Sequence, residues 1–226
     1  MIRAVTLDAH GVLLLPDPGV IRGILKDFSC EPDNGTCWRA HYEMVRLLDL
    51  QVQPDWPTMN RSFANALGVA PSDQDAAGAK LAEKVYLGTS WIPAPGASAA
   101  LAQLIAAGIG AAVVSNTVHG ELSALMERVE LCSVDGDYQR VAAIIDSRVI
   151  GIEKPDPRPF LLALEALGES PARAVHVGDS LHSDVVGAMG VGMRAIHIDP
   201  LNLCDENGHD HATTFEAFVE ELIQSD

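Results

Sequence analysis

The chain of 226 residues has little positive charge and lacks a long apolar run. Only 15 lysines and arginines stand against 31 aspartates and glutamates, which gives a formal net charge of −16. This excess repels polyanions, so we expect no nucleic-acid partner. No apolar run approaches the roughly 18–20 residues of a membrane span, and the first residues lack the basic and apolar segments of a signal peptide. We therefore expect a cytoplasmic protein with no membrane partner.

Cysteines are few and follow no metal-binding or redox pattern. The four cysteines include no Cys-x-x-Cys pair, so we expect free thiols. A zinc site built from Cys30, Cys37 and His41 is not favoured. Another histidine cluster, His209-Asp210-His211, lies in a polar stretch near the end of the chain. We expect that stretch to be a solvated loop and not a set of metal ligands.

The order of the apolar segments predicts an α/β fold. From Pro93 onward, short apolar runs alternate with amphipathic helical segments. Strands are expected at the start of the chain and over residues 111–114, 141–145, 174–177 and 194–198. This alternation is typical of a doubly wound, Rossmann-like parallel sheet with helices on both faces. Capping residues predict helices that begin after Asp156 and after Thr213, and a short helix is expected after Ser183.

Between Gly19 and Leu87 the apolar spacing is helical and contains no strand candidate. Four helices are expected there, and the second should bury a stripe of Trp38, Tyr42 and Val45. We therefore assign residues 1–16 and 92–226 to an α/β core domain and residues 17–91 to an inserted helical cap domain. The aromatic residues of the insert are expected to form mainly its own core.

Polar residues follow the predicted strands at the point where each strand ends. The motifs are Asp8-Ala9-His10-Gly11, Ser115-Asn116, Lys154-Pro155-Asp156-Pro157, and Gly178-Asp179-Ser180 followed by Asp184. Ligands of open α/β sheets bind beyond the carboxyl ends of the strands, so we expect these residues to converge at one edge.

The chemistry of this set suits a phosphoryl group. A carboxylate such as Asp8, flanked by a lysine and a cation, stays ionised and can attack an electrophile. Asp179 and Asp184 supply the oxygen ligands that Mg²⁺ prefers. Ser115 can hold phosphoryl oxygens beside backbone N–H groups, and Lys154 can offset charge on the transferring group.

These motifs, in this order and over nearly the whole chain, resemble the haloacid dehalogenase superfamily of hydrolases with an α-helical (C1-type) cap. The resemblance implies that Asp8 is the nucleophile of a phospho-aspartyl intermediate. It implies further that Ser115, Asn116 and Lys154 bind the phosphoryl group of a small phosphorylated metabolite. Magnesium would be held by Asp8, Asp179, Asp184 and the backbone carbonyl of His10. A monomer or a homodimer is expected.

The sequence departs from that family's phosphatases at two positions. His10 stands where they place an aspartate that acts as general acid and base, and Val12 replaces a threonine. Three interpretations follow: His10 takes the acid/base role, or the chain is a 2-haloacid dehalogenase-type hydrolase, or it binds phosphate and metal with little or no catalysis. Because carbon–halogen displacement needs no metal, Asp179 and Asp184 favour a Mg²⁺-dependent phosphatase with a modified acid/base.

Overall fold

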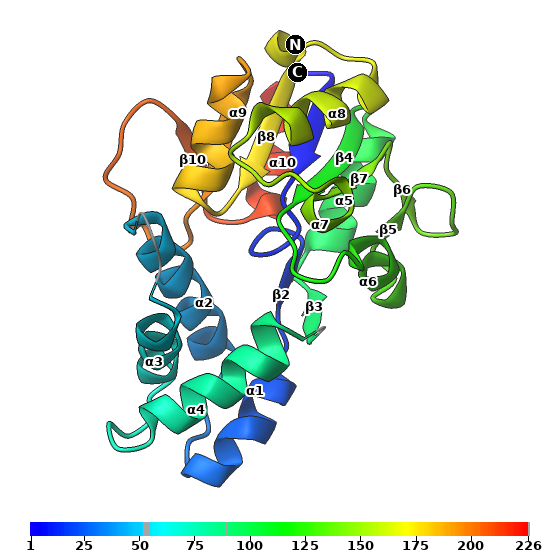
Figure 1. The fold of residues 1–226 in the computed structure, drawn as a ribbon. Coiled ribbons are helices and arrows are strands. Elements are labelled where there is room, and N and C mark those ends of the chain that lie inside the picture. The colour runs from blue at the N-terminus through cyan, green and yellow to red at the C-terminus, as the bar shows by residue number, and fades with distance from the viewer. Residues whose placement is uncertain (52–54, 89, 226) are drawn as a thin grey trace. The chain divides into compact units, whose positions relative to one another are not determined.

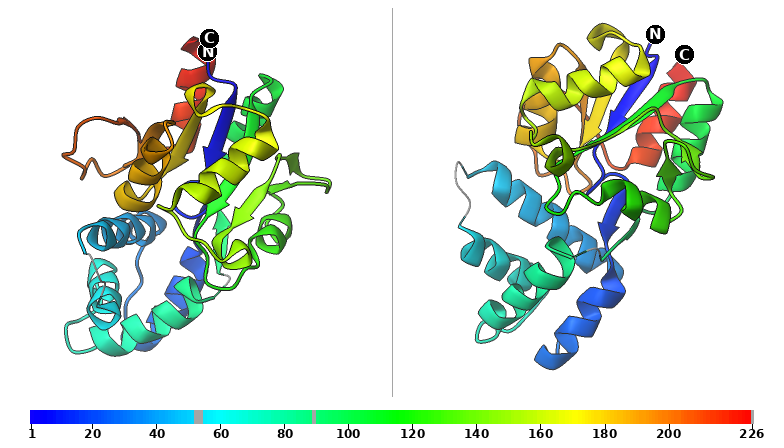
Figure 2. Two further views of the ribbon diagram at one scale, coloured as in Figure 1. Left: turned by 45° about the horizontal axis from the view of Figure 1, so that its top comes forward. Right: turned by 45° about the vertical axis from the view of Figure 1, so that its right-hand side comes forward.

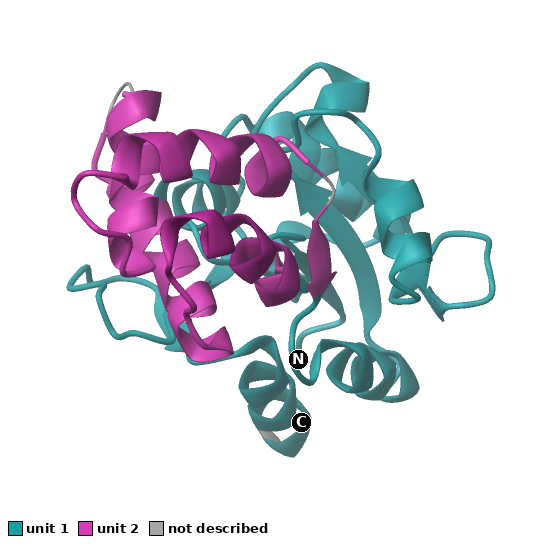
Figure 3. Cartoon of the chain, turned by 90° about the horizontal axis from the view of Figure 1, so that it is seen from below, with its two compact units in different colours: residues 1–14, 93–226 teal, residues 15–92 magenta. Residues whose placement is uncertain are grey.

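The computed structural model describes residues 1–51, 55–88 and 90–225, and the chain divides into two compact units (Figure 3). Unit 1 comprises Met1–Leu14 and Pro93–Asp226, and unit 2 comprises Leu15–Ile92. The predicted domain boundaries, at 16/17 and 91/92, lie within two residues of these divisions. Within the described part of the chain, no helix is long and apolar enough to cross a membrane.

Unit 1 is built on a six-stranded parallel sheet with the strand order β10-β9-β8-β1-β4-β7 (Figure 1). Its strands are β1 (Ala4–Leu7), β4 (Gly110–Ser115), β7 (Ile144–Asp146), β8 (Ala174–Gly178), β9 (Arg194–Ile198) and β10 (Asp210–Ala212). Most residues of β1, β4 and β8 are buried, as expected for strands covered on both faces. The predicted doubly wound α/β architecture is confirmed.

Helices cover both faces of this sheet. Helices α5 (Ala97–Ala106) and α10 (Phe215–Ser225) pack together on one face, and α8 (Pro157–Leu167) and α9 (Gly187–Gly190) pack together on the other (Figure 2). Two further helices are α6 (Leu122–Arg128) and α7 (Ser147–Ile150), and a small separate sheet pairs β5 (Cys132–Ser133) with β6 (Gln139–Arg140).

Capping decides where the helices begin, and two predicted starts are wrong. Asp156 caps α8 as predicted, because its carboxylate accepts a hydrogen bond from Arg158 N at 2.9 Å. Helix α10 is capped one residue later than predicted, since Thr214 Oγ1 accepts from Ala217 N at 3.1 Å. The helical segment expected after Ser183 begins at Leu181, where the Ser180 side chain caps it. This earlier start places Asp184 within the first turn.

The predicted strand over residues 141–145 is wrong in its first half. The strand β7 covers only Ile144–Asp146. Val141 instead donates its N–H to Ser133 O at 3.0 Å, so this residue bonds to the end of β5 and not along the main sheet.

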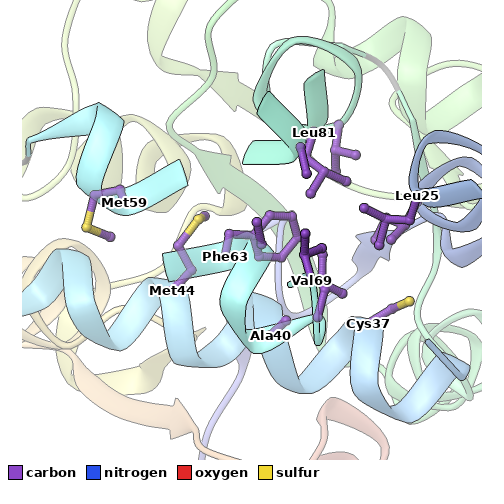
Figure 4. Packing of buried hydrophobic residues seen from close by; sticks show 13 residues of the cluster. Leu25, Cys37, Ala40, Met44, Met59, Phe63, Val69 and Leu81 are labelled. Carbon is purple, nitrogen blue, oxygen red and sulfur yellow. The ribbon is translucent and has the colours of Figure 1, made fainter. Parts of the chain in front are cut away.

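The described part of unit 2 holds four α-helices around their own apolar core, and a single 3-10 turn over Lys26–Phe28 follows the first of them (Figure 4). They are α1 (Pro18–Leu25), α2 (Asn34–Asp49), α3 (Trp56–Ala66) and α4 (Gln74–Leu81), which continues into a wider helical turn over Ala82–Tyr86. The strands β2 (Leu14–Pro16) and β3 (Trp91–Pro93) pair where the chain enters and leaves these helices. The fully buried side chains of the core include Leu25, Cys37, Met59, Phe63 and Leu81.

The predicted buried stripe of α2 is wrong by one position. Trp38, Tyr42 and Val45 are only partly buried, and the helix turns Cys37, Ala40, His41 and Met44 inward instead. A histidine can face inward here because His41 Nδ1 lies 3.2 Å from the hydroxyl of Tyr86 and its ring packs against the ring of Trp91.

Candidate active site

The predicted motifs meet at the carboxyl ends of the central strands. Leu7 of β1 is in register with Val113 of β4 and Val177 of β8, so the residues that follow emerge at one edge of the sheet. Asp8 comes next on β1, and its N–H donates to Val177 O at 2.8 Å. Ser115 is the last residue of β4, and Asp179 directly follows β8.

Lys154 joins two of the carboxylates. Its Nζ lies 3.0 Å from Asp8 Oδ1 and 2.5 Å from Asp184 Oδ1. The lysine is only 4% exposed, and burial alone would lower the pKa of its ammonium group. The charges of Asp184 and Asp8 outweigh that effect and raise the pKa above its ordinary value. Lys154 therefore stays positively charged inside this cluster.

Asp184 is fully buried and strongly hydrogen-bonded. Its Oδ1 accepts from Lys154 and lies 3.1 Å from His176 Nε2, and its Oδ2 accepts from Ser180 N at 3.0 Å. Burial opposes ionisation, but Lys154 and His176 hold the pKa of this carboxyl below its usual value. The carboxylate also lies directly against Gly178, where an added Cβ would come within 2.1 Å of Asp184 Cγ.

The Asp179 carboxylate lies against the turn that follows Asp8. Gly11 adopts a φ of +76°, and a Cβ at this position would come within 1.8 Å of Asp179 Oδ2. Glycine is therefore required both by the backbone conformation and by the space that Asp179 fills. As a result, Asp8, Asp179 and Asp184 offer carboxylate oxygens that all lie within 4.8 Å of one another.

The two residues of the Ser115-Asn116 motif have different surroundings. Ser115 is buried, and its Oγ lies 3.3 Å from His10 Nδ1. The Asn116 side chain instead holds the Lys154 backbone, donating to Lys154 O at 3.0 Å and accepting from Lys154 N at 2.8 Å. Asn116 thus fixes the segment that carries the lysine.

Residues 2–192 match the family model of the haloacid dehalogenase-like (HAD) hydrolases. The chain belongs to this family. A phosphoserine phosphatase from Thermus thermophilus is 34% identical to the hydrolase over 144 residues, which make up 63% of this chain and 55% of that relative. The hydrolase therefore spans little more than half the length of that protein.

Solved structures of HAD proteins share the fold of the hydrolase over nearly its whole length. A HAD phosphatase from Thermococcus onnurineus and an L-2-haloacid dehalogenase from Xanthobacter autotrophicus each have a TM-score of 0.60 over 98% of both chains. Their identities to the hydrolase are 21% and 19%, so these likenesses show the fold alone.

The donor set of the hydrolase suits a hard divalent cation. Three buried carboxylates lie close together and two of them contact one ammonium group, which leaves a formal excess of two negative charges at the site. Carboxylate oxygens are the ligands that Mg²⁺ prefers. Asp184 already accepts hydrogen bonds from Lys154, His176 and Ser180, which hold its carboxylate in place within the cluster.

Sequence reasoning missed two pairs of supporting residues. Thr6 Oγ1 lies 2.8 Å from His176 Nδ1, so a hydrogen-bonded chain runs from Thr6 through His176 to Asp184. Thr6 and His176 are register partners. Because each is a polar residue in an otherwise apolar strand, the sequence alone could have indicated that they bond to each other. Asp146, at the end of β7, accepts hydrogen bonds from the Thr117 hydroxyl and Leu122 N, and so positions the loop after Ser115.

Replacing Gly11 by alanine is expected to displace Asp179 and to weaken Mg²⁺ binding by at least about tenfold, since even the loss of a group that only orients a metal ligand costs about 10- to 100-fold. Gly108→Ala is a matched control, because Gly108 has a φ of +77° but no atom within 4 Å of an added Cβ. Both variants carry the same backbone strain, and only the first carries the clash. Calorimetric titration with Mg²⁺ measures the difference, and equal affinities in the two variants would refute the role given to Gly11.

Proposed function

We propose that this hydrolase is a Mg²⁺-dependent phosphatase that acts on a small phosphorylated metabolite, with Asp8 as the nucleophile. The observation that carries the proposal is the position of Asp8. Its Oδ1 lies 3.0 Å from Lys154 Nζ and 2.7 Å from Ala9 N, within a cluster of two further carboxylates. A dehalogenation site has no need of such an oxygen cluster, whereas a phosphoryl site uses one to hold its cation.

The chain's own residues support each step of this reaction. The bonds from Lys154 and Ala9 fix Asp8 Oδ1 and so orient Oδ2 to attack phosphorus. The bond between phosphorus and the leaving oxygen breaks as an acyl phosphate forms on Asp8, and water then hydrolyses this intermediate to release phosphate. Ser115 Oγ would donate to a phosphoryl oxygen, and Lys154 balances the charge of the transferring group.

Asp8, Asp179 and the backbone carbonyl of His10 would hold Mg²⁺, which neutralises charge on the phosphoryl group when it is bound. We assign a different role to Asp184 and Asn116. Asp184 orients the Lys154 ammonium through its buried ion pair, and Asn116 fixes the Lys154 backbone. Both residues would then act on the reaction through Lys154.

His10 is the proposed general acid and base. Its imidazole lies beside Ser115 Oγ, two residues after the nucleophile, and an imidazole can protonate a leaving alkoxide and then activate water. Replacing His10 by Asn is expected to lower turnover about 10²- to 10⁴-fold and to remove an imidazole-like limb from the pH profile. A pH–rate profile measures both effects. A His10→Asn profile that keeps this limb would exclude the role.

Two assays test the proposed function together. Phosphate release from p-nitrophenyl phosphate and phosphoserine, with and without Mg²⁺, should require both the metal and Asp8. Halide release from 2-chloropropionate in the presence of a chelator should be absent. If halide were released and no phosphate, the 2-haloacid dehalogenase alternative would replace the phosphatase. If neither product formed while the protein still bound Mg²⁺, the chain would be a binding protein.

A further inference from the structure

Four side chains of unit 1 form a second cluster of metal-ligating groups. His197, Cys204, His209 and His211 each offer one ligand atom, and these atoms all lie within 4.8 Å of one another. The expected loop at His209-Asp210-His211 is wrong in part. Asp210 and His211 belong to the strand β10, although both stay exposed to solvent as expected, and His209 is partly buried.

The sheet register brings two of these histidines together. His197 of β9 and His211 of β10 are register partners in a parallel pair, so their side chains lie side by side on one face. Neighbouring Asp210 points to the opposite face, where its Oδ2 accepts from Arg194 Nε at 2.8 Å. This exposed ion pair fixes which face of β10 carries His211.

Asp199 positions the cysteine. Its carboxylate accepts hydrogen bonds from Leu203 N at 3.0 Å and Cys204 N at 2.8 Å, which folds the segment after β9 into a turn. The Asp199 backbone N–H also donates to Ala212 O at 3.0 Å and so closes the base of the same loop. The loop therefore returns Cys204 and His209 to the end of the sheet, where His197 and His211 lie.

The separations within the cluster match a tetrahedral site. Cys204 Sγ lies 3.7 Å from His209 Nε2, and the three ring centroids are 4.5, 5.4 and 5.5 Å apart. With Zn–S near 2.3 Å and Zn–N near 2.0–2.1 Å, tetrahedral zinc separates sulfur from nitrogen by about 3.6 Å and ring centres by about 5 Å. The side chains thus need little movement to share one ion.

His197 also has the hydrogen bond that a ligating histidine normally makes with its second nitrogen. Its Nε2 lies 3.1 Å from the backbone carbonyl of Asp179. A carbonyl only accepts, so Nε2 carries the proton, and Nδ1 is the atom through which this ring could bind a metal ion. A ligating imidazole that donates its other N–H to a carbonyl is held in the correct tautomer and orientation.

We propose that His197, Cys204, His209 and His211 bind one Zn²⁺ ion as a structural site. One thiolate and three imidazoles are borderline-soft donors that favour zinc over magnesium, in contrast to the carboxylate oxygens of the active site. Four protein ligands leave no open position, which is typical of structural zinc and not of catalytic zinc. The ion would tie the segment between β9 and β10 to His197, and through it to the backbone of Asp179.

Titration with Co²⁺, which takes the same ligands as zinc and absorbs visible light, tests this site directly. With Mg²⁺ in large excess to fill the oxygen site, we expect one Co²⁺ per chain with the strong visible absorption of tetrahedral cobalt. A near-ultraviolet thiolate-to-cobalt band should accompany it, and Zn²⁺ should displace both signals. Cys204→Ser should lose the thiolate band and bind at least about 100-fold more weakly, since losing an outer partner alone costs about 10- to 100-fold.

Two further variants complete the experiment. Cys30→Ser is the matched control, because Cys30 is a partly buried free thiol in unit 2. Burial raises the pKa of this thiol, which disfavours the thiolate that binds a metal ion. Its replacement should therefore change neither the visible nor the near-ultraviolet band. His211→Asn changes an exposed residue and should weaken Co²⁺ binding even if Cys204→Ser fails to fold. Two outcomes would overturn the proposal. The wild-type protein could bind neither Co²⁺ nor Zn²⁺, or it could show only the weak spectrum of octahedral cobalt, unchanged in Cys204→Ser and His211→Asn.

Discussion

Replacing Asp8 by Asn is expected to reduce phosphate release by at least about 10⁴-fold, because an amide cannot form the acyl phosphate through which the reaction runs. The variant should still fold. Asn has nearly the same shape, its carbonyl oxygen can accept from Ala9 N as Asp8 Oδ1 does at 2.7 Å, and Lys154 keeps its ion pair with Asp184. Phosphate release at saturating Mg²⁺ gives the turnover, and circular dichroism reports the fold.

Asp27→Asn is the matched control for this change. Asp27 is also paired with a lysine, Lys80 Nζ, at the same distance of 3.0 Å, but the pair is exposed and lies in unit 2. Its loss should leave turnover unchanged. Turnover in Asp8→Asn within tenfold of the wild type would contradict the assignment of the nucleophile.

The central site could be predicted from the sequence because parallel strands share one direction. Buried apolar runs mark β1, β4 and β8, and the polar residues that follow each run must emerge at the same edge of the sheet. Spacing alone therefore places Asp8, Ser115 and Asp179 close together. Which atom bonds to which could not be predicted in this way: the pairing of the Asn116 amide with the Lys154 backbone depends on how two loops pack.

The cluster of His197, Cys204, His209 and His211 could not be predicted from local sequence. His209 and His211 were visible as a pair, but His197 belongs to an apolar strand and Cys204 to a polar stretch without a motif. Only the pairing of β10 with β9 brings them together, and a three-residue edge strand in a polar segment has no clear hydrophobic signal. The one-position error in α2 has a similar cause, because a hydroxyl from a distant helical turn, that of Tyr86, allows His41 to face inward.

Replacing Lys154 by Met is expected to lower the free energy of unfolding by about 3–5 kcal/mol, because the change leaves the charge of Asp184 buried without its lysine partner. The side chains of Lys154 and Asp184 are 2% and 0% exposed, so water cannot replace the lost ammonium group. Methionine keeps the length of the lysine stem, so the loss of charge dominates over the loss of packing. Urea denaturation of the metal-free protein near neutral pH measures the change.

Two comparisons separate this cause from a general effect of losing a lysine. Lys80→Met removes a lysine that is 53% exposed and should cost no more than about 1 kcal/mol. The double variant Lys154→Met with Asp184→Asn also removes the buried, unpaired charge of the Asp184 carboxylate and should be more stable than Lys154→Met alone. Equal unfolding free energies for the Lys154 and Lys80 variants would contradict a buried, charge-dependent role for the pair.

The pH dependence of the Lys154→Met effect has a defined sign. The pKa of Asp184 is held below its ordinary value of 3.8, so the ionised carboxylate stabilises the folded wild type at pH values above 3.8 and loses this contribution as the pH falls lower. In Lys154→Met, protonation of the Asp184 carboxyl stabilises the folded state, because burial opposes the carboxylate charge and no lysine offsets that effect. The difference in unfolding free energy between the two proteins should therefore shrink as the pH is lowered through this range. A difference that stayed constant with pH would show that the lost contacts of the lysine stem, and not its charge, cause the destabilisation.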